Sequence, residues 1–238
     1  MDSRTLPNRL LPFSLHFYRQ FFWGCLGLLV FPILSRAAFA SIAYSTTASD
    51  AVRPLGLPIA LMRLARCAGK TMLLIVRGHL HQPRTNVGRR LAFADGTSAL
   101  VYRETVADRP PLAEPVVLIV EFRMRLLNGR RGRTYFRIVS LLNTPLFAGF
   151  PGFATKLWMA ADEEGKYRGL YEWDNGDSAA DYVRALWWPL ALISRLDSIR
   201  WRVLPGRRRG DLLVAGGEPS AAEGAWWQPV PAGSPQRA

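Results

Sequence analysis

The chain has 238 residues, a hydrophobic content of 49% and a formal net charge of +13. The hydrophobic content excludes an intrinsically disordered chain, and the length allows one large core with appended segments or two small domains. Arginine carries almost all of the positive charge, since only Lys70, Lys156 and Lys166 are lysines, and the charges are spread out in a way that does not favour a nucleic-acid partner.

The cysteines and histidines do not indicate a metal site. Cys25 and Cys67 do not form a C-x-x-C pair, so neither a disulfide framework nor a zinc site is predicted, and a reducing compartment, the cytoplasm, is expected. His79 and His81 would share one face of a strand, but no third ligand is evident beside them. An exposed strand face is the favoured interpretation.

An apolar run occupies residues 21–34, and no charged residue stands between Arg19 and Arg36. The run is shorter than the ~20 residues that a membrane-spanning helix needs, although extending it through Tyr44 would make it long enough. Three interpretations stay open. The segment 21–44 attaches the protein to a membrane, or it forms a buried helix, or it is a signal that is removed after its small-x-small pattern.

Residues 1–70 are predicted as a hydrophobic and amphipathic helical region that ends in a short helix over Leu57–Lys70. This helix is expected either to rest on an anionic membrane surface or to pack against the rest of the protein. Residues 71–113 are predicted as a small β-element and linker, with a strand over Thr71–His81 and a hairpin that turns at Asp95-Gly96.

Residues 114–206 are predicted as the main domain, in which strands and helices follow the order βαββαβ. We expect the strands at 116–124, 153–160, 167–173 and 199–204, and the helices at about 134–148 and from Ser178 onward, where Ser178 and Asp181 resemble a capping box. This order is typical of the ferredoxin-like α+β fold, with both helices on one face of a four-stranded antiparallel sheet. Residues 207–238 are predicted as a disordered tail.

Three motifs in the main domain resemble the YdhR-type monooxygenase family over roughly residues 114–205: Phe150-Pro-Gly-Phe-Ala-Thr-Lys-Leu-Trp158, Tyr167-Arg-Gly-Leu-Tyr-Glu-Trp173 and Ser178-Ala-Ala-Asp-Tyr-Val183. The resemblance implies a dimeric α/β barrel, hence a homodimer, with a pocket between sheet and helices. It further implies a cofactor-independent monooxygenase that acts on a small aromatic or hydrophobic compound. The haem-degrading branch of the superfamily is not favoured, because the main domain contains no histidine.

An oxygenase of this kind needs a dry, aromatic-lined pocket with a few polar groups that orient and deprotonate the substrate. The predicted substrate-binding residues are Trp158, Tyr171, Trp173 and Arg123, and the predicted catalytic residues are Glu172, Asn143 and Glu121. Strand alternation places Tyr171 and Trp173 opposite Glu172, so the sequence leaves the face of the site open. For each polar residue the alternative is an ordinary salt bridge.

Two other classes of protein are alternatives to the oxygenase. RNA-recognition domains share the βαββαβ order, but Leu170 and Tyr171 follow Arg168-Gly169 where their motif places a stacking aromatic and a small residue, so nucleic-acid binding is not favoured. A non-catalytic dimeric module, which binds a small hydrophobic ligand or only a second subunit, predicts the same fold and the same aromatic residues. Only turnover separates that module from an enzyme.

Overall fold

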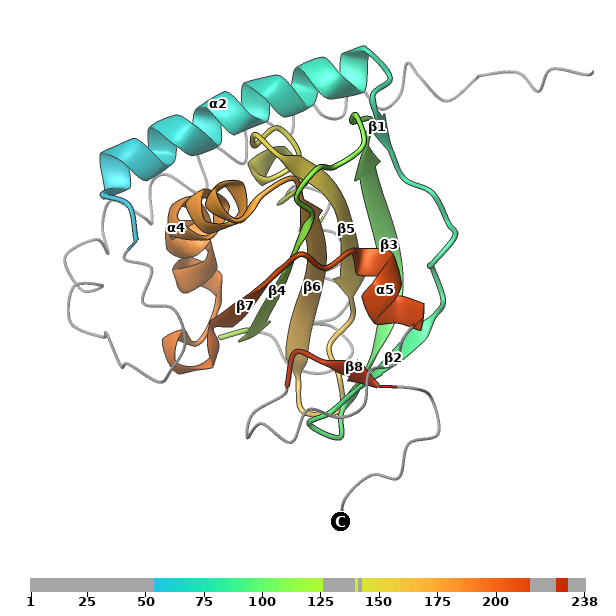
Figure 1. Cartoon of the computed structure of the whole chain (residues 1–238). Coiled ribbons are helices and arrows are strands. Elements are labelled where there is room, and N and C mark those ends of the chain that lie inside the picture. Colours follow the sequence, from blue (N-terminus) through green and yellow to red (C-terminus); the bar gives the residue numbers. More distant parts are fainter. Residues whose placement is uncertain (1–53, 126–139, 141–142, 215–225, 231–238) are drawn as a thin grey trace, which may run out of the picture. The chain divides into compact units, whose positions relative to one another are not determined.

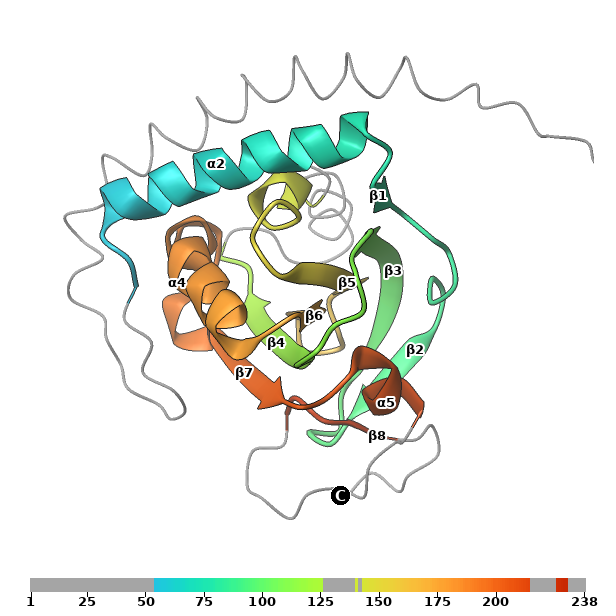
Figure 2. The ribbon, with the colours of Figure 1, turned by 45° about the horizontal axis from the view of Figure 1, so that its top comes forward.

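The computed structural model describes residues 54–125, 140, 143–214 and 226–230. In this part of the chain, eight strands form one antiparallel sheet that curls into a half-barrel (Figures 1 and 2). The strand order is β7-β4-β6-β5-β3-β2-β8, and β1 pairs with β3 beside this path. The apolar run at 21–34 lies outside the described residues, and among those described no helix is long and apolar enough to cross a bilayer.

The sheet is built from strands of very different length. The strands are β1 (Leu80–His81), β2 (Arg90–Phe93), β3 (Ser98–Ala107), β4 (Val116–Arg123), β5 (Phe153–Met159), β6 (Lys166–Trp173), β7 (Arg200–Pro205) and β8 (Pro229–Val230). The helices are α2 (Leu57–Val76), α4 (Gly176–Ile193) and α5 (Arg209–Val214), with 3-10 turns η1 (Thr144–Leu146) and η2 (Leu196–Ser198). Helices α2 and α4 lie on one side of the sheet, which we call the helix face, and α5 lies against the other, the opposite face (Figures 1 and 2).

Both faces of the sheet carry a hydrophobic core. On β4, Leu118 and Val120 belong to the core of the helix face, whereas Val117 and Ile119 belong to the core of the opposite face. This explains why β4 begins with five consecutive apolar residues instead of alternating with polar ones. Trp226, just before β8, packs into the opposite-face core. Each central strand is therefore held from both sides.

The predicted fold class was wrong. The structure is an eight-stranded curled antiparallel sheet rich in strand, and it is neither a four-stranded ferredoxin-like βαββαβ unit nor the barrel formed by a pair of such units. The ten-residue strand β3 pairs with β5, where the predicted sheet would have ended, and β2 and β8 extend it further. The pattern of residues 114–206 shows which segments are strands, but it cannot show that another part of the chain adds strands to the edge of their sheet. Homodimer formation stays a prediction.

Several local predictions are confirmed, and others are wrong. The strands of the main domain lie within one or two residues of their predicted positions, and β2 and β3 form the hairpin expected at Asp95-Gly96, with Gly96 at φ 81°. Of the strand predicted over 71–81, only Leu80–His81 is a strand, because α2 continues to Val76. Residues 207–238 were predicted as a disordered tail, yet they include α5 and β8. The predicted helix at 134–148 falls largely outside the described residues.

Candidate functional site

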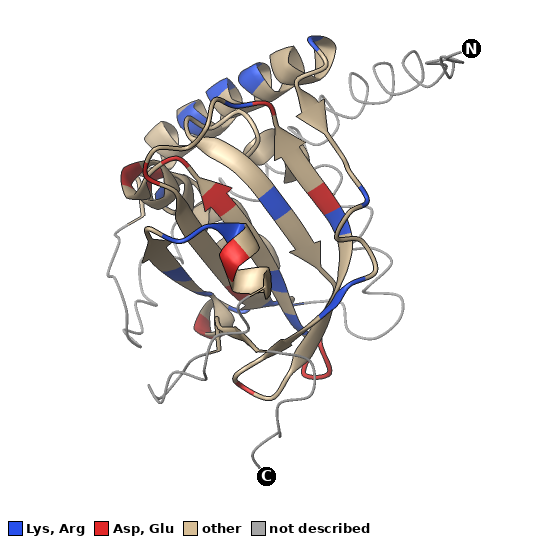
Figure 3. Ribbon diagram, turned by 45° about the vertical axis from the view of Figure 1, so that its right-hand side comes forward, with Lys and Arg blue, Asp and Glu red and all other residues tan. Residues whose placement is uncertain are grey.

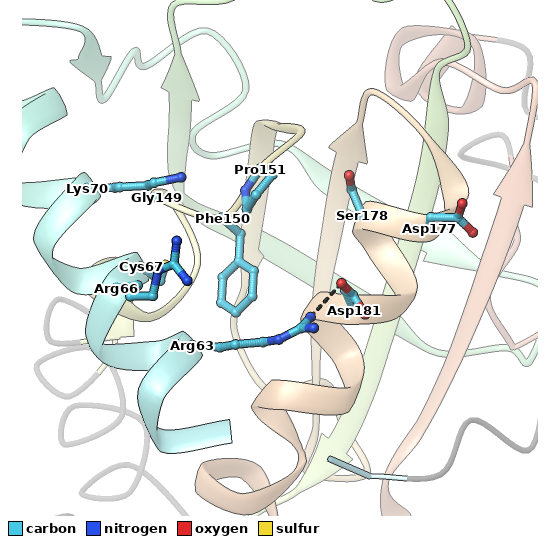
Figure 4. A pocket seen from close by; sticks show the side chains of 10 residues that line it. All are labelled: Arg63, Arg66, Cys67, Lys70, Gly149, Phe150, Pro151, Asp177, Ser178 and Asp181. Carbon is cyan, nitrogen blue, oxygen red and sulfur yellow. Dashed lines mark hydrogen bonds and ion pairs between the residues drawn. The ribbon is translucent and has the colours of Figure 1, made fainter. Parts of the chain in front are cut away.

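A cleft of about 340 Å³ opens on the helix face between α2, the start of α4 and the turn that leads into β5 (Figure 4). Polar and charged side chains and the exposed Pro151 form its rim, and the buried side chains of Phe150 and Cys67 lie deeper. Its lining residues are Arg63, Arg66, Cys67, Lys70, Gly149, Phe150, Pro151, Asp177, Ser178 and Asp181.

The wall formed by α2 is cationic because its basic residues recur with the spacing of one helix side. Arg63, Arg66 and Lys70 are three and four residues apart, and in Figure 4 their side chains extend from α2 toward the turn and α4. Arg63 forms an ion pair of 2.5 Å with Asp181. Within the described ranges, neither Arg66 nor Lys70 has an acidic partner. Two cations of the wall are therefore available to a ligand.

The opposite wall is the first turn of α4. The helix begins after Asn175, whose side chain accepts a hydrogen bond of 2.8 Å from the backbone N–H of Ser178, so the capping box predicted from Ser178 and Asp181 was wrong. The positive end of the α4 dipole thus faces the cleft, although Asp177 in the same turn offsets part of it. Both walls together carry more positive than negative charge, since Arg63 and Asp181 neutralise each other.

Glycine at position 149 brings the floor of the cleft directly against α2. A Cβ atom at this position would lie 2.1 Å from the carbonyl oxygen of Cys67 and 2.7 Å from the backbone nitrogen of Thr71. Cys67 is 2% exposed, and burial raises the pKa of its thiol to about 12, so the thiol stays protonated at neutral pH. Cys67 therefore packs as a small apolar group and does not serve as a nucleophile.

An aromatic cluster lies beneath the cleft and begins with its floor. The ring of Phe150 packs edge-on against Tyr182 at a centroid distance of 5.4 Å, and the hydroxyl of Tyr182 donates to that of Tyr171 at 3.2 Å. The pKa of both tyrosines is raised, primarily by burial, so both hydroxyls stay protonated. Trp158 and Trp173 complete the cluster on the same face. The three aromatic residues predicted to line a pocket, Trp158, Tyr171 and Trp173, are thus brought together.

Lys156 is the one cation enclosed by this cluster among the described lysines. Its Nζ lies 3.2 Å from the ring centroid of Trp158, 4.3 Å from that of Phe147 and 4.5 Å from that of Tyr171, and the residue is 2% exposed. No carboxylate pairs with it in the part of the chain that the structure describes. Burial, together with the charge of Arg103, holds the pKa of Lys156 well below its ordinary value. Its amine is therefore a candidate base.

The predicted polar residues lie elsewhere. Glu121, Glu172 and Arg123 project on the opposite face, where Glu172 accepts a hydrogen bond of 3.4 Å from the backbone N–H of Arg209 and Arg123 pairs with Glu164 at 2.7 Å. Asn143 directly precedes η1. The structure thus separates Glu121, Glu172 and Arg123 from the aromatic residues that they were expected to serve.

Glu121 belongs to a buried ion network centred on Arg168, whose side chain is fully buried. Arg168 lies 2.7 Å from Asp95, 2.7 Å from Glu121 and 2.9 Å from Asp162, and Arg200 also approaches Glu121 to 2.7 Å. Burial would raise the pKa of Asp95, but the hydrogen bond from Thr97 and the charges of Arg168 and Lys166 hold it below its ordinary value. This network ties β6 to β4 and to the β2–β3 turn.

Sequence reasoning overlooked Lys156, although a signal was present. It is one of three lysines in an arginine-rich chain, and on β5 it alternates in phase with Ala154 and Trp158, both of which are buried. The cleft had no comparable signal, because it joins residues of α2 to residues far along the chain that only the fold brings together.

Comparison of this chain with protein-family models, with curated proteins and with solved structures found no match. The relation to the YdhR-type family stays a prediction from the sequence. Within the described residues, no group of three or more histidine, cysteine, aspartate or glutamate side chains is placed to hold a metal ion.

Proposed function

We propose that this protein binds a small molecule with an anionic group and an apolar or aromatic body in the cleft between α2 and α4. The observation that carries the proposal is the pair of cations, Arg66 and Lys70, that line a half-open cleft and have no acidic partner in the described chain. Charge-assisted hydrogen bonds from such groups to carboxylate or phosphate are among the strongest polar contacts in proteins. The positive end of the α4 dipole lies on the other side and favours an anion there, although Asp177 offsets part of it.

The apolar body of the ligand is inferred from the floor. Phe150 and Pro151 present ring and pyrrolidine surface to the cleft, and a volume of about 340 Å³ suits a ligand of one or two rings. An anion bound at the rim would thus place its apolar part against Phe150. Phenyl phosphate and benzoate have both features and serve as probes.

Replacing Arg66 and Lys70 together by alanine is expected to weaken the binding of phenyl phosphate at least about tenfold. Each charge-assisted hydrogen bond contributes about 1.5–3 kcal/mol, and 1.4 kcal/mol corresponds to a factor of ten. Isothermal titration calorimetry measures the change. Arg77→Ala is the matched control, because Arg77 caps the same helix but does not line the cleft. Equal affinity in the double variant and the wild type would exclude the cleft as the anion site.

The second candidate function is the cofactor-independent monooxygenase reaction, and the observation in its favour is Lys156. The reaction begins when a base removes a proton from a phenol or quinol, and a buried amine whose pKa is lowered by desolvation and by the charge of Arg103 is a candidate to accept that proton. The phenolate formed would then lie close to two cations, the protonated Lys156 and Arg103, whose guanidinium carbon is 4.0 Å from the Trp158 centroid. On this proposal the aromatic cluster must open to admit the substrate, because Lys156 is 2% exposed and does not line the cleft.

The oxygenase proposal predicts oxygen uptake by the purified protein with a panel of quinols and polyphenols, without added cofactor and after metal chelation. Lys156→Met should lower the rate at least about 100-fold, because general-base catalysis contributes a factor of about 100 or more. Lys166→Arg is the control, since Lys166 lies far from the aromatic cluster, paired with Asp95 and Glu164. Absence of uptake from folded protein, or unchanged uptake in Lys156→Met, would leave the ligand-binding module as the function.

A further inference from the structure

The outer side of α2 carries an unusual concentration of exposed apolar side chains. Ile59 is 48% exposed, Met62 53%, Leu73 46% and Val76 61%. Among the residues that the structure describes, only three other large hydrophobic side chains are comparably exposed: Val87, Leu100 and Val214. The exposed surface on α2 therefore requires its own explanation.

These four residues lie on one side of α2, which we call the stripe, as two apolar pairs separated by Arg66 and Gly69. Ile59 and Met62 are three residues apart, as are Leu73 and Val76. The helix side that faces the core is distinct, since Ala60, Leu64, Cys67, Ala68 and Thr71 are its buried residues. The stripe runs the length of a 20-residue helix, about 30 Å, and points away from the sheet.

The charges of α2 are of one sign. The helix contains no aspartate or glutamate, and its charged residues are Arg63, Arg66 and Lys70, with Arg77 at its C-cap; the ribbon of α2 accordingly carries the colour of lysine and arginine alone (Figure 3). Of these four, Arg63 alone has an acidic partner within the described chain. An apolar stripe bordered by unpaired cations is typical of helices that lie in the plane of a membrane surface.

We propose that α2 docks lengthwise on an anionic membrane surface through the stripe Ile59, Met62, Leu73 and Val76. The four apolar side chains would enter the boundary between headgroups and acyl chains, while Arg66, Lys70 and Arg77 reach the lipid phosphates from the edge. Charge complementarity favours this partner over a second copy of the chain, because two such helices would bring like charges together. The four stripe residues do not line the cleft, whereas Arg66 and Lys70 do, so the variant that tests this inference leaves Arg66 and Lys70 unchanged.

Sedimentation of the full chain with vesicles tests this proposal. Wild-type protein should bind vesicles of phosphatidylcholine with about one third phosphatidylglycerol and bind pure phosphatidylcholine vesicles at least about tenfold more weakly. The variant Met62→Glu/Leu73→Glu should lose at least about tenfold in partitioning to the anionic vesicles, because each carboxylate must leave water and meet anionic headgroups. Val214→Glu, which changes an 86% exposed residue on α5, should bind like the wild type.

Binding that is equal for both vesicle compositions would overturn the proposal, as would equal binding by the Met62→Glu/Leu73→Glu variant and the wild type. Light scattering and circular dichroism complete the experiment. If the double variant loses mass in solution while vesicle binding is unchanged, the stripe joins two copies of the chain instead. The mutated side chains are half exposed, so the helical signal of the variant should equal that of the wild type.

Discussion

Replacing Arg168 by methionine is expected to lower the free energy of unfolding by about 3–5 kcal/mol, because it leaves buried carboxylates without their counter-charge. The side chains of Arg168 and Asp162 are fully buried, and that of Glu121 is 3% exposed. Arg200 would still neutralise Glu121, but nothing else in the network pairs with Asp162. Urea denaturation followed by circular dichroism measures the loss.

Arg195→Met is the matched control for Arg168→Met. Arg195 pairs with Asp197, but both side chains are more than half exposed, and such surface pairs contribute about 0–1 kcal/mol. A loss below about 1 kcal/mol in Arg168→Met would show that the carboxylates are solvated or protonated in the folded state. The ion network would then contribute little to the stability of the sheet.

Replacing Lys156 by methionine should have the opposite sign and raise the free energy of unfolding at pH 7 by on the order of 1–3 kcal/mol. Methionine has a similar length and packs well against aromatic rings, and it removes an amine whose charged form is costly to bury. For a chain of this size, 1 kcal/mol corresponds to roughly 2–4 °C in Tm. Thermal unfolding followed by circular dichroism measures the gain.

The pH dependence gives this second prediction a distinct signature. In the unfolded chain Lys156 binds its proton up to about pH 10, whereas in the folded protein it releases the proton at a lower pH, since burial lowers its pKa. Wild-type stability should therefore gain from this residue as the pH rises from the lowered pKa toward 10. The advantage of Lys156→Met should be largest at and below the lowered pKa and vanish above pH 10. An advantage that does not change with pH would mean that Lys156 is charged inside the protein.

A destabilising lysine in the core is more readily understood as a functional group than as a structural one. If Lys156→Met stabilises the protein and also abolishes turnover or ligand binding, the two results together assign a role to the amine. If it stabilises the protein and changes nothing else, Lys156 is a tolerated core residue. The stability measurement thus decides how the activity measurement is to be interpreted.

Short-range patterns predicted the strands well. Short runs rich in apolar and β-forming residues, bounded by turn residues, marked β4, β5, β6 and β7, and the Asp95-Gly96 turn marked the β2–β3 hairpin, because residue preference and turn chemistry are local properties. The end of α2 was placed too early. Thr71 is fully buried against the core, and Met72, Leu73 and Leu74 have high helix propensity, so the helix continues to Val76.

The features that could not be predicted all depend on contacts between distant segments. Whether β5 ends the sheet or pairs with β3 depends on residues some fifty positions away, and the same holds for the cleft between α2 and α4. The aromatic residues of the candidate site were recognised by type, but their partner Lys156 was not, because a lone lysine in a strand normally points to solvent. Glu121 and Glu172 were predicted as catalytic residues because a carboxylate can act as a base. The pleat of β4 and β6 places both on the opposite face of the sheet, away from the aromatic residues.

The pairing of β2 with β8 affects how this protein can fold during its synthesis on the ribosome. Ala92 pairs with Val230 and Phe93 with Pro229, and Trp226 completes the core between them. The β2–β3 hairpin therefore emerges long before the strand that covers its outer edge has been synthesised. Until that strand arrives, Leu91 and Phe93 lack part of their cover and the edge of β2 is open to other chains. Slow synthesis of the segment that carries Trp226 and β8 would prolong the interval in which nascent chains can aggregate through the open edge of β2.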